Sequence, residues 1–246
     1  MEELFIKACS QSLSNVQNIY FANPTIDIST QNERAFRFAC WVGRLDVAQW
    51  LFLVKPTIDV SAYNEQAFRY ACGGGHLSVA QWLFAVKPTI DISAQYEQAF
   101  RCACNRGHLS VAQWLLSIKP TIDVSARDEE AFRYACGGGH LSVAQWLFAV
   151  KPTIDISAQF EQAFRCACNR GHLSVAQWLF TLKPILYVIR VDECTGSIKS
   201  WRVRSAEHAR WQTRKCALWL RVQQTHANVF SKVSEDVSRY IVQMFL

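Results

Sequence analysis

Apolar and polar positions recur along most of the chain with a constant spacing of 32 residues. Residues 67–98 show the pattern best: a short apolar stripe (Ala67, Phe68, Ala71 and Cys72) precedes a wider one over residues 77–84. Apolar residues spaced three and four positions apart predict helices that bury one face. A fixed period of this length predicts a stack of repeated units. Five clear copies begin at Ala35, Ala67, Ala99, Ala131 and Ala163.

Turn residues separate the two predicted helices of each copy. Glycines at residues 73–75 end the first helix, because glycine readily adopts the positive φ that follows a helix C-terminus. Lys87 and Pro88 end the second helix, because proline cannot continue its hydrogen-bond ladder. Residues 89–93 are β-branched and alternating, which predicts an extended return segment. We therefore expect each copy to be helix, turn, helix and extended loop.

A tryptophan occupies the same position of the second helix in every clear copy: Trp50, Trp82, Trp114, Trp146 and Trp178. One unit cannot bury its apolar face alone, so we expect these side chains to pack between neighbouring units. Truncation of one to alanine is then expected to cost about 3–5 kcal/mol. A row of aromatic rings that stacks on a ligand is the alternative interpretation.

Residues 67–84 resemble an ankyrin repeat in their two apolar helices and in the Gly-His pair between them. That pair is Gly75-His76, Gly107-His108, Gly139-His140 and Gly171-His172, whereas the first clear copy has Gly43-Arg44. The resemblance covers residues 5–193 and implies a helix-turn-helix solenoid. The repeats of this chain are also similar to the divergent ankyrin arrays of large DNA viruses.

The repeats depart from the ankyrin pattern in three ways. Their period is 32 residues, Gln66-Ala67 replaces the family's Thr-Pro opening, and the loop has no glycine at its tip. These departures put a regular β-hairpin loop in doubt. A tight turn into an earlier start of the first helix is the alternative.

The expected fold is all-α, an ankyrin-like solenoid with a short C-terminal region outside the repeats. Residues 1–34 form a degenerate N-terminal capping repeat, residues 35–193 five ankyrin-like repeats, and residues 194–246 a basic C-terminal cap. In residues 186–203 the pattern predicts two short strands around a glycine-containing turn, and two helices follow. Ser205 and Ser234 are the expected N-caps of those helices.

Positions that vary between copies are candidates for partner binding, because in ankyrin-like stacks they resemble the residues of the concave face and loop tips. Copies two and four, and copies three and five, are nearly identical, which implies a 64-residue duplication. Drift at solvent-exposed positions is the alternative explanation. The candidates are Tyr63, Tyr70, Gln95, Tyr96, Asn105, Arg106, Arg127, Tyr134, Gln159, Phe160, Asn169 and Arg170.

Composition favours an intracellular protein without a membrane span. No apolar run approaches the ~20 residues of a transmembrane helix, and the N-terminus lacks the features of a signal peptide. Seven of the ten cysteines follow the repeat, as small packing residues would. A disulfide scaffold would instead be short and loop-rich. We therefore expect a reducing compartment, cytoplasmic or nuclear.

Metal-binding and catalytic patterns are weak. Each inner repeat has a Cys-x3-His pair such as Cys72 and His76, but zinc needs four converging ligands. We interpret the histidine as a turn residue whose ring can bond backbone. Cys102-Ala-Cys104 lacks the spacer of redox motifs, and no phosphate loop or nucleophile elbow occurs. We predict no catalytic residue, no metal and no cofactor.

Positive charge belongs to the C-terminal region: residues 184–246 carry a net charge of +5, against +1 for the rest. Basic residues and tryptophans interleave there, as in some nucleic-acid-binding segments. We favour instead a cap on the open end of the array, because terminal repeats need a polar exterior. Loss of nucleic-acid affinity on neutralising the basic residues would reverse this preference; they are Arg202, Arg204, Arg210, Arg214 and Lys215.

The final segment, residues 230–246, has an amphipathic helical pattern and resembles the opening of an F-box. Ser234 replaces that motif's proline. The resemblance implies recruitment of the adaptor of a cullin–RING ubiquitin ligase. The adaptor-binding candidates are Val233, Val237, Tyr240, Ile241 and Met244. Packing of this helix against the array is the alternative.

Together these patterns predict a monomeric, non-enzymatic scaffold that binds a partner protein through its concave face and loops. A substrate receptor of a ubiquitin ligase and a nucleic-acid-binding protein are the alternatives.

Overall fold

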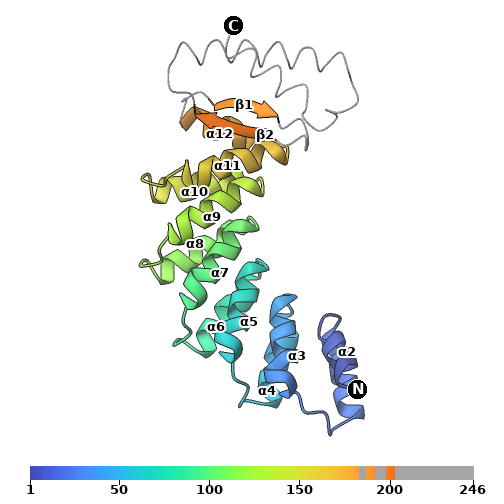
Figure 1. Ribbon diagram of the computed structural model, residues 1–246. Helices are drawn as coiled ribbons and strands as arrows, with labels where there is room; N and C mark the ends of the chain where they lie inside the picture. The colour runs from blue at the N-terminus through green and yellow to red at the C-terminus, as the bar shows by residue number, and fades with distance from the viewer. Residues whose placement is uncertain (183–186, 192–197, 203–246) are drawn as a thin grey trace, which may run out of the picture. The chain divides into compact units, whose positions relative to one another are not determined.

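The computed structural model describes residues 1–182, 187–191 and 198–202 (Figure 1). The chain divides into two compact units, Met1–Ala131 and Phe132–Leu246. Most of the predicted C-terminal cap lies outside the described residues, including its two helices and the F-box-like segment.

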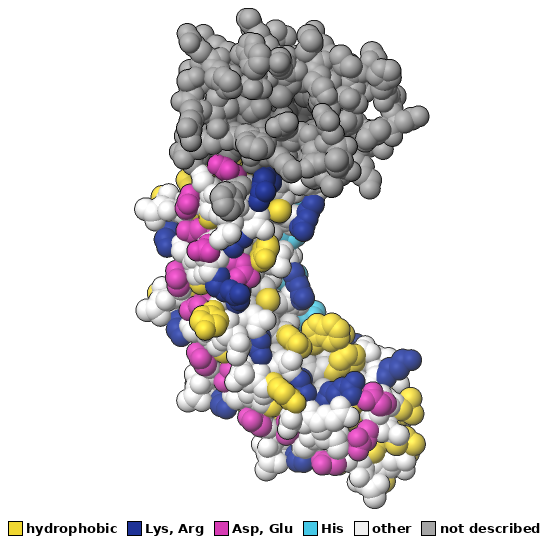
Figure 2. All heavy atoms as spheres, viewed as in Figure 1, with side chains coloured by type: hydrophobic (Ala, Val, Ile, Leu, Met, Phe, Trp, Pro, Cys, Tyr) yellow, Lys and Arg dark blue, Asp and Glu magenta, His cyan; other side chains and the backbone are white. Residues whose placement is uncertain are grey.

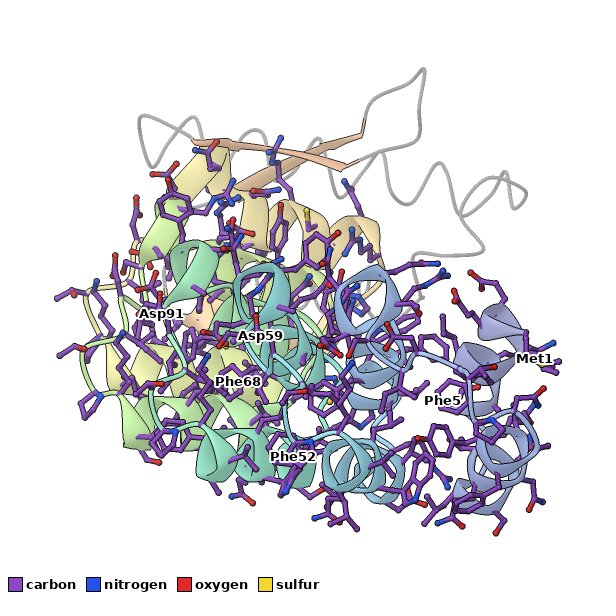
Figure 3. The ribbon with its side chains drawn as sticks, turned by 90° about the horizontal axis from the view of Figure 1, so that it is seen from below. Met1, Phe5, Phe52, Asp59, Phe68 and Asp91 are labelled. Carbon is purple, nitrogen blue, oxygen red and sulfur yellow. The ribbon has the colours of Figure 1, made fainter. Side chains whose placement is uncertain are left out.

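Unit 1 is a stack of helix pairs. Its helices are α1 (Glu2–Ala8), α2 (Leu13–Ala22), α3 (Thr30–Trp41), α4 (Leu45–Val54), α5 (Ala62–Gly73), α6 (Leu77–Val86), α7 (Ala94–Asn105) and α8 (Leu109–Ile118). The helix α9 (Ala126–Gly137) begins in this unit. The first helices α3, α5 and α7 pack on one another, and each also packs on the second helix of its own pair. First and second helices thus form two rows, with Phe68 between them (Figure 3).

Unit 2 contains the remainder of α9, with α10 (Leu141–Val150), α11 (Ala158–Asn169) and α12 (Leu173–Leu182). A two-stranded antiparallel sheet follows, formed by β1 (Tyr187–Val191) and β2 (Ile198–Arg202). Tyr187 lies opposite Arg202, and Val191 lies opposite Ile198. The helix α11 packs against α12 and β2. These strands lie within residues 186–203, where the sequence predicts a hairpin.

The core repeats with the sequence. Phe68, Cys72 and Leu83 are fully buried, and so are the equivalent residues of the neighbouring repeats. Trp82 lies against two rings of the preceding repeat, with centroids 6.1 Å from Phe36 and 5.9 Å from Phe52. Trp114 and Trp178 repeat this contact. The predicted role of the tryptophan row in packing between repeats is thereby confirmed at these positions.

The predicted extended return segment is wrong: the loop is a series of turns. In residues 87–94 the amide of Ile90 donates to the carbonyl of Lys87 at 3.1 Å, and that of Ala94 donates to Asp91 at 3.1 Å. The Asp91 side chain also accepts the Ser93 amide at 3.0 Å. Aspartate and proline stabilise such turns locally, and here this outweighs the β propensity of the isoleucines. The tight turn of the alternative is present, but its earlier helix start is not: Gln95, Tyr96 and Glu97 at the beginning of α7 have positive φ, so the right-handed helix starts only after them.

Each first helix begins with a turn of the opposite hand. In α5, Tyr63, Asn64 and Glu65 have φ of 56°, 55° and 61°, although none is glycine. Residues 31–33, 95–97 and 127–129 have the same conformation. For an L-residue this left-handed region costs roughly 1–2 kcal/mol. We call residues 63–65 and their equivalents the left-handed turn; it needs stabilising contacts.

Candidate partner-binding surface

An arginine of the first helix stabilises each left-handed turn. The Nε of Arg69 donates to the carbonyl of Asn64 at 2.7 Å, and its Nη2 donates to that of Tyr63 at 2.8 Å. Its Nη1 donates to the side-chain oxygen of Gln98 in the next repeat. The planar guanidinium group suits this arrangement, because its donors point in fixed directions. One side chain therefore fixes its own loop and links it to the neighbouring repeat.

The same arrangement recurs along the chain. Arg37 donates to the carbonyls of Gln31 and Asn32 and to the Gln66 side chain. Arg101 donates to the carbonyls of Gln95 and Tyr96, and it pairs with Glu130 at 2.6 Å. We call this arginine, at residues 37, 69, 101, 133 and 165, the loop arginine. Sequence reasoning missed it, although its invariance in all five copies was a signal.

Replacing Arg69 with alanine is expected to cost about 1–3 kcal/mol, because two loop carbonyls and Gln98 lose a charged donor. Lysine at this position should not restore the stability, since an ammonium group lacks the fixed donor directions of the planar guanidinium group. Urea unfolding measures the free energy, and hydrogen exchange of residues 62–66 reports the loop.

Arg34→Ala is the control for this substitution. Arg34 forms an ion pair with Glu3, and their side chains are 42% and 69% exposed. Such a surface pair contributes about 0–1 kcal/mol. Equal losses of unfolding free energy for Arg34→Ala and Arg69→Ala would show that the Arg69 guanidinium group does not stabilise the left-handed turn.

Polar contacts also join successive loops. The buried carboxylate of Glu65 accepts the Asp91 amide of the next loop at 3.4 Å. The carboxylate of Glu33 accepts the Asp59 amide at the same distance. Lys87 donates to Ser61 and lies 3.9 Å from the Asp59 carboxylate. Asp59 and Asp91 therefore occupy equivalent places on successive loops (Figure 3).

The histidine of the Gly-His pair bonds backbone, as predicted. His76 Nε2 lies 3.1 Å from the carbonyl oxygen of Trp41 in the preceding repeat. A Cβ on Gly74 would lie 2.7 Å from this ring and 3.2 Å from that oxygen. Among the described residues, no group of three or more His, Cys, Asp or Glu side chains is placed to hold a metal ion.

The loop candidates point their side chains outward. Tyr63 is 56% exposed and Tyr96 is 73% exposed. The Tyr63 ring covers the Arg37 guanidinium group at 4.6 Å, and its hydroxyl accepts from the Asn32 side chain at 3.0 Å. The other loop candidates are also exposed, namely Gln95, Arg127 and Gln159. The side chain of Phe160 lies outside the described residues.

The candidates before the Gly-His pair have a packing role as well. Arg106 donates to the Gly73 carbonyl of the preceding repeat at 2.9 Å. A Cβ on Gly73 would approach the Cβ of Cys102 to 3.1 Å, a tight contact that a larger residue could make only if its neighbour shifted. The same geometry recurs in unit 2 among Gly137, Cys166 and Arg170. The fit between two alternating types of repeat thus accounts for the variation at Arg106 and Arg170. These two residues are exposed nevertheless, and so are Asn105 and Asn169.

The first-helix candidates Tyr70 and Tyr134 are 38% and 39% exposed. The Tyr134 ring lies 5.7 Å from the Arg133 guanidinium group. The Tyr70 hydroxyl accepts from the Gln66 side chain at 2.8 Å. Tyr70 also lies near Trp41, with ring centroids 6.4 Å apart, and Trp41 was not among the predicted site residues.

Burial raises the thiol pKa of most of the repeat cysteines. It raises the pKa of the thiols of Cys40, Cys72, Cys104 and Cys136 well above their ordinary value, and that of Cys168 to about 12. Cys102, Cys166 and Cys168 are half-buried, and burial raises the pKa of Cys102 as well. Since the thiolate is the nucleophile, the buried positions favour packing over chemistry.

Iodoacetamide at pH 8 should therefore label Cys102 and Cys166 of the folded chain well before Cys72 and Cys104. A raised pKa leaves less thiolate at a given pH, and burial also excludes the reagent. Peptide mapping by mass spectrometry measures the rates, with guanidinium-unfolded chain as the fully labelled control. Similar rates at Cys72 and Cys102 would contradict the burial of the repeat cysteines.

The adaptor-binding candidates Val233, Val237, Tyr240, Ile241 and Met244 lie outside the described residues, and so does most of the basic segment. In the part of the chain that the structure describes, every helix is too short or too polar to cross a membrane.

Comparison with known proteins supports the fold. Residues 100–148 match the family model of ankyrin repeats (many copies). The crystal structure of the human ASB11 ankyrin repeat domain is similar, with a TM-score of 0.54 and 17% sequence identity. This similarity covers 78% of the present chain and 88% of the other chain. No curated protein matches the chain.

The family model spans parts of two successive helix pairs, from within α7 to within α10, and the structural similarity extends over 78% of the chain. Residues 100–148 thus match ankyrin repeats in sequence, and the chain has the fold of an ankyrin repeat domain.

Proposed function

We propose that the protein is an interaction scaffold that binds a partner protein through its loops and the exposed ends of its first helices. One observation carries the proposal: aromatic side chains at successive loop tips, Tyr63 and Tyr96, are more than half exposed while the backbone beneath them is clamped. Tyrosine is enriched at protein interfaces, where it supplies a large contact area.

The loop arginine makes these tips suitable for binding. Tyr63 and Tyr96 lie in left-handed turns whose carbonyls accept from Arg69 and Arg101. A loop fixed before association loses less conformational entropy when the partner binds. Repeat arrays of this kind also present extended surfaces that a protein partner can cover.

Affinity purification from eukaryotic cells with quantitative mass spectrometry tests the proposal. The bait is the full chain, beside Tyr63→Ser/Tyr96→Ser and the control Gln81→Ala/Gln113→Ala, which alters exposed residues of two second helices. We expect specific proteins with the full chain and the control, and at least a tenfold loss with the tyrosine variant.

Failure to enrich any protein above a tag-only background would overturn the scaffold proposal. Equal recovery by the tyrosine variant and the full chain would reject the loop tips as the contact surface. Circular dichroism checks that each variant remains folded.

A second candidate function rests on the sequence of residues 230–246, which resembles the opening of an F-box. In this proposal the segment recruits a cullin–RING ligase adaptor while the repeats hold a substrate. A version of the chain that ends at Asn228 tests it. Adaptor subunits should copurify with the full chain and disappear with the shortened one; their absence from both would reject the proposal.

A further inference from the structure

Trp41 and Val42 expose large apolar side chains that the stacking of repeats does not require. Trp41 is 47% exposed and Val42 is 37% exposed. The equivalent residues are Gly73-Gly74 in the second clear copy and Asn105-Arg106 in the third. Those repeats form the same helix pair without an apolar side chain there. Exposed apolar groups that cluster mark sites of interaction more often than isolated ones do.

These two residues belong to such a cluster. The Trp41 ring lies 5.5 Å from that of Phe38 on the same helix and 6.4 Å from that of Tyr70 on α5. We call Phe38, Trp41, Val42 and Tyr70 the aromatic patch. Figure 2 shows hydrophobic side chains gathered near the ends of α3 and α5, with a histidine beside them.

The surroundings of the aromatic patch are positively charged. Arg37 and Arg69 both interact electrostatically with Tyr70, and each also interacts with one buried carboxylate, that of Glu33 or Glu65. Their hydrogen bonds go to uncharged oxygens, those of loop carbonyls and glutamine side chains. Arg106 likewise donates to a backbone carbonyl, that of Gly73. Uncharged acceptors orient these guanidinium groups without neutralising them.

The acidic groups of the same repeats form their hydrogen bonds with other partners. The carboxylates of Glu33 and Glu65 are buried in the left-handed turns, where each accepts an amide of the next loop. Arg44, next to the patch in sequence, is paired with Asp46 at 2.8 Å. Arg37, Arg69 and Arg106 thus outnumber the two buried carboxylates of Glu33 and Glu65, and a net positive charge remains for a ligand.

We propose that the aromatic patch and these three arginines form a docking site for an acidic protein segment with a tryptophan, phenylalanine or leucine anchor. The anchor packs on Trp41, Val42 and Tyr70, where aromatic rings offer edge-to-face contacts. Flanking carboxylates lie towards the arginines, whose field accelerates association and sets the orientation of the segment. The inference rests on the proposed function and names the class of partner.

Selection from a phage library of random dodecapeptides against the full chain tests the proposal. Selected peptides should be enriched in Asp and Glu around an aromatic or leucine residue. Fluorescence anisotropy then measures the Kd of one labelled peptide for each variant. Trp41→Gly/Val42→Gly installs the residues of the second copy, and Tyr70→Cys installs that of the third, Cys102.

Either variant should weaken binding at least tenfold, and raising NaCl from about 50 to 500 mM should weaken it further, because salt screens exposed charges. Leu53→Ala is the matched control: Leu53 is 76% exposed on α4, and its equivalent in the second copy is Ala85. It should leave the Kd unchanged. Tyr70→Cys keeps the test decisive if the double variant fails to fold.

Enrichment of neutral or basic peptides would overturn the proposal, and so would equal binding by the patch variants. In that second case peptides still bind the chain, so the scaffold function stands and only the docking site fails. A single-stranded RNA dodecamer, titrated in parallel, must bind more weakly than the peptide. Tighter RNA binding that the patch variants abolish would assign this surface to nucleic acid instead.

Discussion

Replacing Phe68 with alanine should lower the free energy of unfolding by about 3–5 kcal/mol, the usual cost of removing a fully buried aromatic side chain. Phe68 is 0% exposed, and its ring centroid lies 6.1 Å from that of Trp114 in the next repeat. The cavity would therefore open at a junction between repeats. Because each repeat contacts only its neighbours, the loss should appear there first.

Urea unfolding followed by circular dichroism gives the free energy, and hydrogen exchange locates the loss. Protection should fall most in α5, α6 and the flanking helices α7 and α8. Leu53→Ala is the control, since Leu53 is largely exposed and a surface substitution changes stability by about 0.5 kcal/mol or less. Similar losses for the two variants would contradict the central place of Phe68 in the core.

Periodicity predicted the helices well because it reports burial directly. The apolar stripe of residues 77–84 and the stop at Lys87-Pro88 match α6, which spans Leu77–Val86. The stripe at Ala67, Phe68, Ala71 and Cys72 matches the buried face of α5. In both helices the spacing of apolar side chains predicts the buried face, and a glycine or proline predicts where the helix ends.

The left-handed turn could not be predicted in the same way. Tyr63, Asn64 and Glu65 include no glycine, and residue type alone argues against positive φ at three consecutive positions. Their conformation depends on Arg69, which lies several residues later, and on Gln98 of the next repeat. The conformational propensity of a segment's own residues does not reveal contacts that come from outside the segment.

Variation between copies gave a mixed guide to the candidate surface. It selected Tyr63 and Tyr96, whose side chains are exposed at the loop tips. It also selected Arg106, where the variation follows the fit of Cys102 and Arg106 against Gly73. Two causes, exposure and complementarity between alternating repeats, produce the same sequence signal. The exposure and the contacts of each side chain in the folded protein distinguish the two causes.

Gly75→Ala is expected to cost about 2–5 kcal/mol, from two separate causes. Gly75 has a φ of +79°, where an L-residue is disfavoured by roughly 1–2 kcal/mol. An added Cβ would also lie 2.5 Å from Nδ1 of His108 in the next repeat, and overpacking of this kind costs about 1–3 kcal/mol. The glycine thus serves the turn of its own repeat and the histidine of its neighbour.

A double-mutant cycle with His108→Ala separates the two causes. Removing the ring relieves the overlap but leaves the backbone strain, so Gly75→Ala should cost less by about 1–3 kcal/mol in the His108→Ala background. Urea unfolding of the four proteins measures the coupling. Strict additivity would mean that the ring moves aside without cost and that the positive φ alone requires glycine. A coupling of the expected size would instead assign the Gly-His pair a joint role, in which each glycine makes room for the histidine of the next repeat.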